Sequence, residues 1–220
     1  MPRLARVVAP GYPHHVTQRG NYKQPVFEKE EDYVYYLELL RKYCHKYRLN
    51  IWAYCLMRNH VHFVCIPLRD DSLAKTFNTL HMLYAQYVNR KKGAAGHLWQ
   101  GRFYSCILDE RHVYGAVRYV ENNPVRSGLV KHAEDYRWSS ARNHIKDVSD
   151  EILSKDCPLL GEISNWGAYL KEREDNDVLT NIRKNGIMGR PCGDDSFIKK
   201  LERRFERRLK ALPRGRPRKK

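Results

Sequence analysis

The sequence lacks the features that mark membrane, secreted and disulfide-stapled proteins. The 220 residues contain no apolar run of the roughly 18 residues that span a bilayer. The short N-terminal apolar stretch is interrupted by Pro10 and Pro13, so it does not resemble a secretory signal. The six cysteines are scattered and include no CxxC pair, which argues against a disulfide framework. We therefore expect a reduced, cytoplasmic protein with no membrane partner.

Acidic residues are few relative to basic ones. The chain carries 41 Lys and Arg against 25 Asp and Glu, a formal net charge of +16. The excess is concentrated at the C-terminus, because residues 199–220 hold 12 basic and 2 acidic side chains. A charge of this size and placement predicts a polyanionic partner, and nucleic acid is the usual one.

The spacing of apolar residues predicts an α+β fold. Strands are predicted within 13–21 and at 49–57, 60–67 and 102–108, and helices at 30–47, 72–92 and 110–123. Only Arg58 and Asn59 separate the second and third strands, so these two form a hairpin, and Pro124 stops the third helix. The β-α-β-β-α-β order matches a ferredoxin-like antiparallel sheet with helices on one face. Its other face is then open to a ligand.

The C-terminal third is predicted to form an extension of the 1–145 domain. Residues 146–193 look like a connector with short helices, and 194–212 form a basic amphipathic helix. This helix docks on the first domain or contacts a partner. Within the 194–220 extension, the Arg214-Gly215-Arg216-Pro217 stretch resembles an AT-hook core, which enters a narrow minor groove. A generic cationic tail that adds sequence-independent affinity is the competing interpretation.

The stretch "MRNHVHFVCIP" places two histidines in a predicted strand. His60 and His62 are two residues apart and share one face of the strand, while Cys65 points to the other. This alternation argues against a zinc site that combines the histidine pair with Cys55 and Cys65. Two structural histidines remain one interpretation, since a metal site needs a further ligand.

The third helix supplies candidate partners in "RYVENNPVRSGLV". Tyr119 and Asn123 are four residues apart, so they can lie on one helical face. Tyr119 is alternatively an amphipathic core tyrosine, and Asn123 is alternatively a helix C-cap before Pro124. Tyr114 is too far around the helix to share the site easily. A zinc hydrolase with Glu121 as its base is a further alternative, although Glu121 lies off the Tyr119 face.

Taken together, these stretches resemble a known family. "HHVTQRGN", "MRNHVHFVCIP", "HLWQGRFYSCIL", "RYVENNPVRSGLV" and "YRWSSARNH" resemble, in order, the single-tyrosine transposases of the IS200/IS605 type, and specifically the REP-associated tyrosine transposases. His60-Val61-His62 is similar to their His-hydrophobic-His (HUH) motif. The resemblance implies that Tyr119 is the nucleophile, that His60 and His62 bind a metal, and that Asn123 stands where relatives have a glutamine ligand.

The resemblance also implies the chemistry. The enzyme is expected to be a metal-dependent endonuclease and strand transferase that forms a 5′-phosphotyrosine on single-stranded or hairpin DNA. A mixed imidazole and amide site suits Mn²⁺, whereas Mg²⁺ prefers more oxygen ligands and zinc also fits the ligand types. The expectation of Mg²⁺ or Mn²⁺ therefore rests mainly on the resemblance. No nucleotide triphosphate is needed, in agreement with the absence of a GxxxxGK[ST] loop. With one such tyrosine per chain, the protein acts as a monomer or a homodimer.

Several basic and aromatic residues are candidate DNA contacts. They are Arg19, Trp99, Arg102, Tyr104, Arg126, Arg214 and Arg216. Aromatic rings can stack on bases and arginines can bind phosphates. Trp99 and Phe103 are alternatively core residues. The competing function is a non-catalytic DNA- or RNA-binding regulator that keeps the transposase fold.

Overall fold

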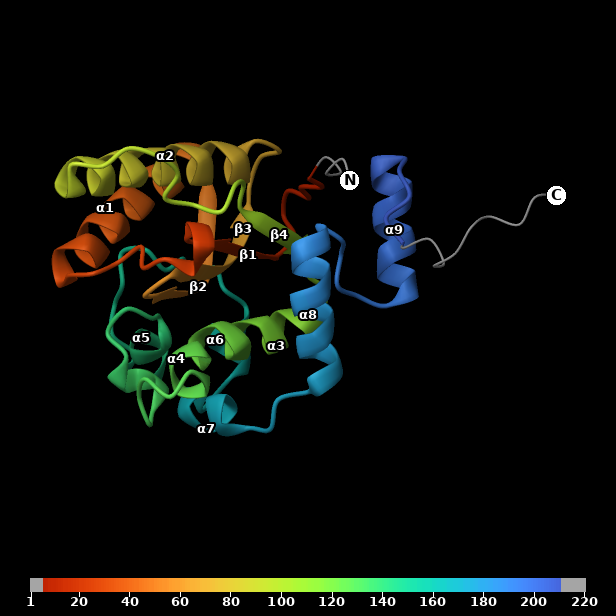
Figure 1. Cartoon of the computed structure of the whole chain (residues 1–220). Coiled ribbons are helices and arrows are strands. Elements are labelled where there is room, and N and C mark those ends of the chain that lie inside the picture. The colour runs from red at the N-terminus through yellow and green to blue at the C-terminus, as the bar shows by residue number, and fades with distance from the viewer. Residues whose placement is uncertain (1–5, 211–220) are drawn as a thin grey trace.

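A four-stranded antiparallel sheet forms the centre of the computed structural model, which describes residues 6–210 (Figure 1). The strands are β1 (His14–Arg19), β2 (Leu49–Met57), β3 (His60–Pro67) and β4 (Tyr104–Ile107), and their order is β2-β3-β1-β4. This is the ferredoxin-like order, with the first and third strands in the centre. The predicted α+β class is therefore confirmed, and the hairpin of β2 and β3 lies where the sequence places it.

Two long helices cover one face of the sheet. They are α1 (Glu30–Tyr47) and α2 (Ser72–Lys92), each followed by a C-cap residue in the left-handed conformation, Arg48 and Gly93. Their buried side chains, such as Leu40 and Phe77, join Val61 and Phe63 of β3 in one apolar core. Burial of this core provides the main stabilisation of the sheet.

The second face of the sheet, left open in the sequence interpretation, is covered by helices of the C-terminal half (Figure 1). These helices are α3 (Glu110–Glu121), α4 (Asn123–Arg126), α5 (Ala141–Lys146), α6 (Leu159–Glu162), α7 (Trp166–Lys171) and α8 (Asn176–Met188), together with the 3-10 turn η2 (Ala133–Asp135). A second turn, η1 (Asn21–Lys23), follows β1. Residues 146–193 thus include helices that pack against α3 and the sheet.

The third helix ends earlier than predicted. α3 stops at Glu121 with Asn122 as its C-cap, and Asn123 begins the short helix α4. Pro124 lies inside α4 instead of terminating α3. Proline is tolerated in the first turn of a helix, because the missing N–H has no partner there. Asn123 is therefore not the C-cap that the alternative interpretation made it.

The last described helix, α9 (Asp195–Phe205), is shorter than the predicted 194–212. Its C-cap is Glu206, whose backbone is left-handed, and the side chain of Glu202 accepts hydrogen bonds from the N–H groups of Leu209 and Lys210. Leu201 and Leu209 pack with Val7, Ala9 and Ile107, so the apolar stripe docks on the domain. Arg214, Arg216 and Leu212 lie outside the described residues. No helix within residues 6–210 combines the length and apolar character of a membrane span.

Candidate active site

His60, His62 and Tyr119 come together on the second face of the sheet. The rings of His60 and His62 lie 4.9 Å apart at 85°. Tyr119 projects from α3, and its ring centre is 5.5 Å from that of His62, again edge to face. Cys65 is buried with the α1 and α2 core on the opposite face, as the strand alternation predicts. The distances group the tyrosine with the histidine pair.

A third histidine belongs to this group and was missed in the sequence. His15 lies on β1, with its Nε2 atom 3.0 Å from Nδ1 of His62 and its ring stacked on that of His62 at 5.2 Å. Its ring is also 5.9 Å from that of Tyr119. Strand alternation does place His15 on the same face as Arg19. Strand alternation alone could not identify His15, because only the pairing of β1 with β3 brings it beside His62.

Burial keeps these imidazoles neutral. Desolvation lowers the pKa of His15 to about 4. Desolvation, followed by the charges of Arg19 and Arg126, lowers the pKa of His60 to about 4. The pKa of His62 lies well below its ordinary value for the same first reason, with His15 and His60 contributing next. Neutral imidazoles retain a nitrogen lone pair at neutral pH, which is the form that binds metal ions.

The hydrogen bonds leave one nitrogen free on each of the paired histidines. Nδ1 of His60 lies 2.6 Å from Oδ1 of Asn59, which can only accept, so this nitrogen carries the proton. Nδ1 of His62 is engaged by His15. Across residues 6–210, neither Nε2 atom has a hydrogen-bond partner. Two Nε2 lone pairs are the donor set that a divalent transition metal accepts.

Asn123 fits a metal only in one orientation of its amide. Its Oδ1 accepts a 3.4 Å hydrogen bond from Ser127, while its buried Nδ2 has no partner among the described residues. Turning the amide would present the oxygen where the unpaired nitrogen now lies. In the described part of the chain, no cluster of three His, Cys, Asp or Glu side chains could hold a metal. Within this part of the chain, a third ligand would therefore be an oxygen of an amide, a hydroxyl or a main-chain carbonyl group, or would come from water or substrate.

Two arginines lie against the ring of Tyr119. The guanidinium carbon of Arg126 is 4.2 Å from the ring centre, and its Nη2 donates to the Tyr119 carbonyl oxygen at 2.9 Å. Arg126 also pairs with Glu174 at 2.7 Å. The guanidinium carbon of Arg183, on α8, is 5.3 Å from the same ring centre. Arg183 was not identified in the sequence, since it lies in the segment interpreted as a connector.

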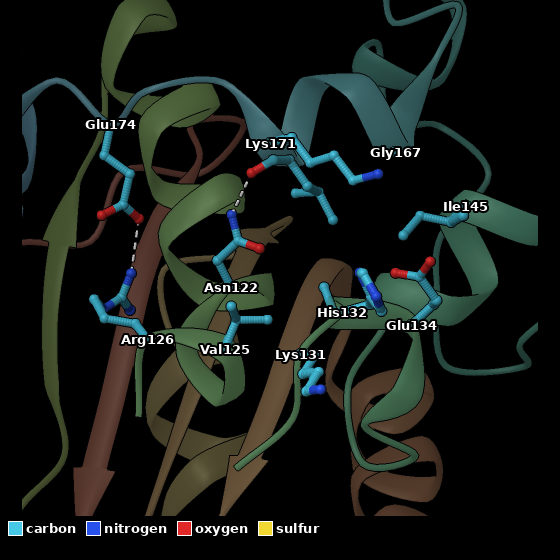
Figure 2. Close-up of a pocket in the computed structure, with 12 residues that line it drawn as sticks. Asn122, Val125, Arg126, Lys131, His132, Glu134, Ile145, Gly167, Lys171 and Glu174 are labelled. Atoms are coloured by element: carbon cyan, nitrogen blue, oxygen red, sulfur yellow. Dashed lines mark hydrogen bonds and ion pairs between the residues drawn. The ribbon is translucent and has the colours of Figure 1, made fainter. Parts of the chain in front are cut away.

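Arg126 also borders a surface pocket of about 290 Å³ beside α4 (Figure 2). The pocket is lined on other sides by Lys131, His132 and Lys171. Figure 2 shows the Arg126–Glu174 ion pair at its edge. The pocket therefore combines the cations of Arg126, Lys131 and Lys171 with the carboxylates of Glu134 and Glu174.

The other predicted DNA contacts divide into accessible and buried groups. Arg19 and Arg102 are exposed, and Tyr104 is half-buried on β4 opposite Thr17 of β1. Trp99 is only 8% exposed, and its Nε1 donates to the carbonyl oxygen of His81. The prediction that Trp99 stacks on a base is therefore wrong, since its ring belongs to the core with Phe103.

Glu121 cannot serve as a catalytic base at this site. It is completely buried, and its carboxylate accepts hydrogen bonds from Ser140 and Trp166, with Nδ1 of His144 2.6 Å away. This network ties the end of α3 to α5 and α7. The zinc-hydrolase interpretation, which needed Glu121 beside the histidine pair, is therefore wrong.

Comparisons of the sequence and of the fold with known proteins all find transposases. The model of the family described as "Transposase IS200 like" matches residues 10–123, more than half of the chain. A Haemophilus influenzae protein classed as a REP-associated tyrosine transposase is 27% identical over 124 residues, which cover 51% of this chain and 69% of that protein. A solved structure of a REP-associated tyrosine transposase bound to a REP hairpin has a similar fold, with a TM-score of 0.53 at 19% identity. The match covers 71% of this chain and 93% of that one.

Proposed function

The chain belongs to the IS200-like transposase family, and from this premise we propose that it cuts and rejoins single-stranded DNA through a covalent bond to Tyr119. The observation that carries the proposal is the position of the Tyr119 ring against His15 and His62, with the guanidinium groups of Arg126 and Arg183 beside it. A tyrosine beside neutral imidazoles and two cations is suited to attack a phosphodiester.

The proposed reaction conserves the energy of the phosphodiester bond. The Oη atom of Tyr119 loses its proton to solvent as it bonds to phosphorus, and the bond from phosphorus to the 3′ oxygen breaks. The 3′ oxygen takes up a proton, and the 5′ phosphate stays on the tyrosine. Attack by another 3′ hydroxyl reverses these steps and releases the tyrosine, so strands are transferred without a nucleotide triphosphate.

A divalent cation such as Mn²⁺ fits the donors described above, and Mg²⁺, which prefers more oxygen ligands, is the second candidate. His60 and His62 would hold it through their Nε2 atoms, and Asn123 through its oxygen after the amide turns. When bound, such an ion neutralises charge on the scissile phosphate and stabilises the leaving oxygen as a Lewis acid. The hydrogen bonds that His60 and His62 donate to Asn59 and His15 orient the two imidazoles for this role.

The proposed substrate is single-stranded DNA, in particular DNA that carries a hairpin. A REP-associated relative of similar fold has been solved with a REP hairpin, and this chain has the positive charge that such a ligand requires. The candidate phosphate contacts are Arg19, Arg102 and Arg126, and Tyr104 is a candidate for stacking. Arg214 and Arg216 in the tail would add affinity for a neighbouring duplex.

The proposed division of labour assigns the tyrosine and the histidine pair to 1–145, and assigns DNA affinity to the basic helix and tail of 194–220. Residues 146–193 join the two and carry α8, whose Arg183 lies at the tyrosine. Since each chain has a single tyrosine beside the histidine pair, it forms one covalent bond at a time. Paired cleavages then require a homodimer or two successive reactions by a monomer.

Covalent trapping tests the proposal. Wild type, Tyr119→Phe and, as a matched control, Tyr114→Phe are incubated with Mg²⁺ or Mn²⁺ and labelled single-stranded oligonucleotides from the DNA that flanks the gene, hairpins included. We expect a metal-dependent protein–DNA band on a denaturing gel that Tyr119→Phe abolishes and Tyr114→Phe keeps. An equal band from Tyr119→Phe would assign the nucleophile elsewhere. Binding without any band would favour the non-catalytic regulator.

A further inference from the structure

Arg183 is an exposed arginine of α8. Its guanidinium lies against the ring of Tyr119, and within residues 6–210 it has no ion pair or hydrogen bond. Arg126, the other arginine at this ring, is occupied by Glu174 and by the Tyr119 carbonyl oxygen. The five N–H donors of Arg183 are therefore available to an anion that approaches the tyrosine.

Close packing places α8, and with it Arg183, over the active site. Gly115 of α3 faces Val178 of α8, and a Cβ atom at Gly115 would lie 2.4 Å from Cγ1 of Val178. Further along α8, Gly186 lies against His15, with 3.9 Å from a Cβ position to Nδ1. Gly115 thus allows α8 to approach the tyrosine-bearing helix closely, whereas a Cβ atom at Gly186 would make only an ordinary contact with His15.

Ion pairs hold the segment that leads into α8. Glu172 pairs with Arg118, and Asp175 pairs with Arg111, both of which lie on α3. Glu174 pairs with Arg126 of α4. The acidic residues before α8 are therefore neutralised by arginines of the α3–α4 segment. Arg183 is left as an unneutralised cation on the same side of the molecule.

We propose that Arg183 is a further catalytic residue, which binds a non-bridging oxygen of the scissile phosphate as Tyr119 attacks it. This inference rests on the proposed function and adds a residue from outside segment 10–123, where the family match ends. A guanidinium binds phosphate through paired N–H donors, and it stabilises the negative charge that grows on the oxygens during attack. Its charge would come from α8, whereas the histidines of the proposed metal site lie on β3.

The loss of reaction rate when Arg183 is replaced distinguishes a cation that stabilises the reacting phosphate from one that only stacks on the Tyr119 ring. Loss of one preorganised donor at a developing negative charge slows a reaction by about 10²–10³-fold. Lysine keeps the charge but lacks the planar fork, so Arg183→Lys should recover only part of the rate. A guanidinium that only stacks on the Tyr119 ring would affect stability and not the interaction with phosphate.

The first experiment compares rates of covalent adduct formation under single-turnover conditions. The reaction of the wild-type protein shows which phosphate of the oligonucleotide is cut. The Tyr119→Phe variant shows whether the band of the protein–DNA adduct depends on the tyrosine. We expect Arg183→Ala to slow adduct formation about 100-fold and Arg183→Lys to be intermediate. Lys184→Ala, an exposed neighbour on α8, should match wild type. If wild type forms no adduct, the proposed function fails and this inference fails with it.

The second experiment tests the contact with the phosphate independently of the reaction rate. In the Tyr119→Phe background, fluorescence anisotropy measures the affinity for the same oligonucleotide with either a phosphodiester or a neutral methylphosphonate at the cut position. We expect Arg183→Ala to weaken binding of the phosphodiester about tenfold and to leave the methylphosphonate affinity nearly unchanged. Equal losses for both oligonucleotides, or an adduct rate within threefold of wild type, would overturn the role of Arg183 alone.

Discussion

The Nδ1 atom of His62 lies 3.0 Å from the Nε2 atom of His15. When Nε2 of His62 binds a metal, its Nδ1 carries the proton and His15 must accept it. The contact therefore fixes both the tautomer and the orientation of a proposed metal ligand. The side chain of His15 has no other hydrogen bond within the described chain, since its buried Nδ1 is unpaired.

His15→Phe is expected to weaken Mn²⁺ binding roughly 10–100-fold while preserving the fold, because phenylalanine keeps the ring volume but cannot accept the proton. Titration followed by Mn²⁺ electron paramagnetic resonance measures the affinity. His14→Gln is the matched control, because His14 is equally buried on β1 but bonds to Ala9 and Tyr12 instead. An unchanged affinity in His15→Phe, or an equal loss in the control, would remove the orienting role.

Glu121→Gln is expected to lower the free energy of unfolding by about 2 kcal/mol or more. The carboxylate accepts from Ser140 and Trp166 beside His144, and an amide would bring a donor toward these donors. Urea denaturation followed by tryptophan fluorescence measures the change. Glu151→Gln, which removes one end of an exposed ion pair with Arg41, should change stability by less than about 0.5 kcal/mol. Similar values for both variants would contradict the structural role of Glu121.

Stability is expected to fall as the pH is lowered from 7 to 5, because several histidines are buried in the neutral form. Burial lowers the pKa of His81 to about 3. In the unfolded chain this histidine has an ordinary pKa of about 6.5, so it is protonated below that pH. In the folded chain it stays neutral until the pH approaches the lower folded pKa. Each such histidine therefore stabilises the fold above about pH 6.5, and this contribution is lost progressively toward the folded pKa.

His81→Gln should reduce the slope of unfolding free energy against pH in this window by up to about 1.4 kcal/mol per pH unit. Denaturation curves at pH 5, 6, 7 and 8 measure it, and the slopes of the two proteins should coincide between pH 7 and 8. The glutamine can still bond to the hydroxyl of Tyr36, which lies 3.0 Å from Nε2 of His81. A slope that is unchanged below pH 6 would contradict the neutral state of His81.

Removal of residues 211–220 is expected to weaken DNA binding without slowing the covalent step at saturating DNA. This segment holds five basic residues, Arg214 and Arg216 among them. Affinity decreases with salt, so a plot of log affinity against log salt has a negative slope. For every phosphate that the shortened protein no longer binds, this slope should become shallower by roughly 0.7 for a single strand. Anisotropy titrations between 50 and 200 mM salt measure this. An equal loss for AT-rich and GC-rich hairpins would indicate a generic tail, and a larger loss for AT-rich stems would indicate binding in the minor groove.

The sequence predicted those parts of the fold that depend on local pattern. The bounds of α1, β2 and β3 agree with the prediction, because continuous apolar spacing and a two-residue turn determine them. The end of α9 was missed, since it depends on the side chain of Glu202 reaching the N–H groups of Leu209 and Lys210. Covalent neighbours alone do not reveal such a bond.

The candidate site was predictable only where two residues share one element. His60 with His62, and Tyr119 with Asn123, are related by strand and helix periods. His15 and Arg183 come from a different strand and a different helix, so tertiary packing alone brings them to the tyrosine. The prediction that Trp99 contacts DNA failed for the same reason, because tertiary packing against α2 buries its ring.

The contact between Val178 and Gly115 affects how proteins of this family can be shortened or recombined. A fragment ending near residue 145 would lack α7 and α8, and it would uncover apolar side chains such as Val113 and Val117 that these helices help to bury. We expect it to aggregate, because contiguous exposed apolar surface promotes association. Chimeras that exchange DNA preference between relatives should therefore be joined after residue 193, where the chain has left α8 and only α9 and the basic tail remain to be exchanged.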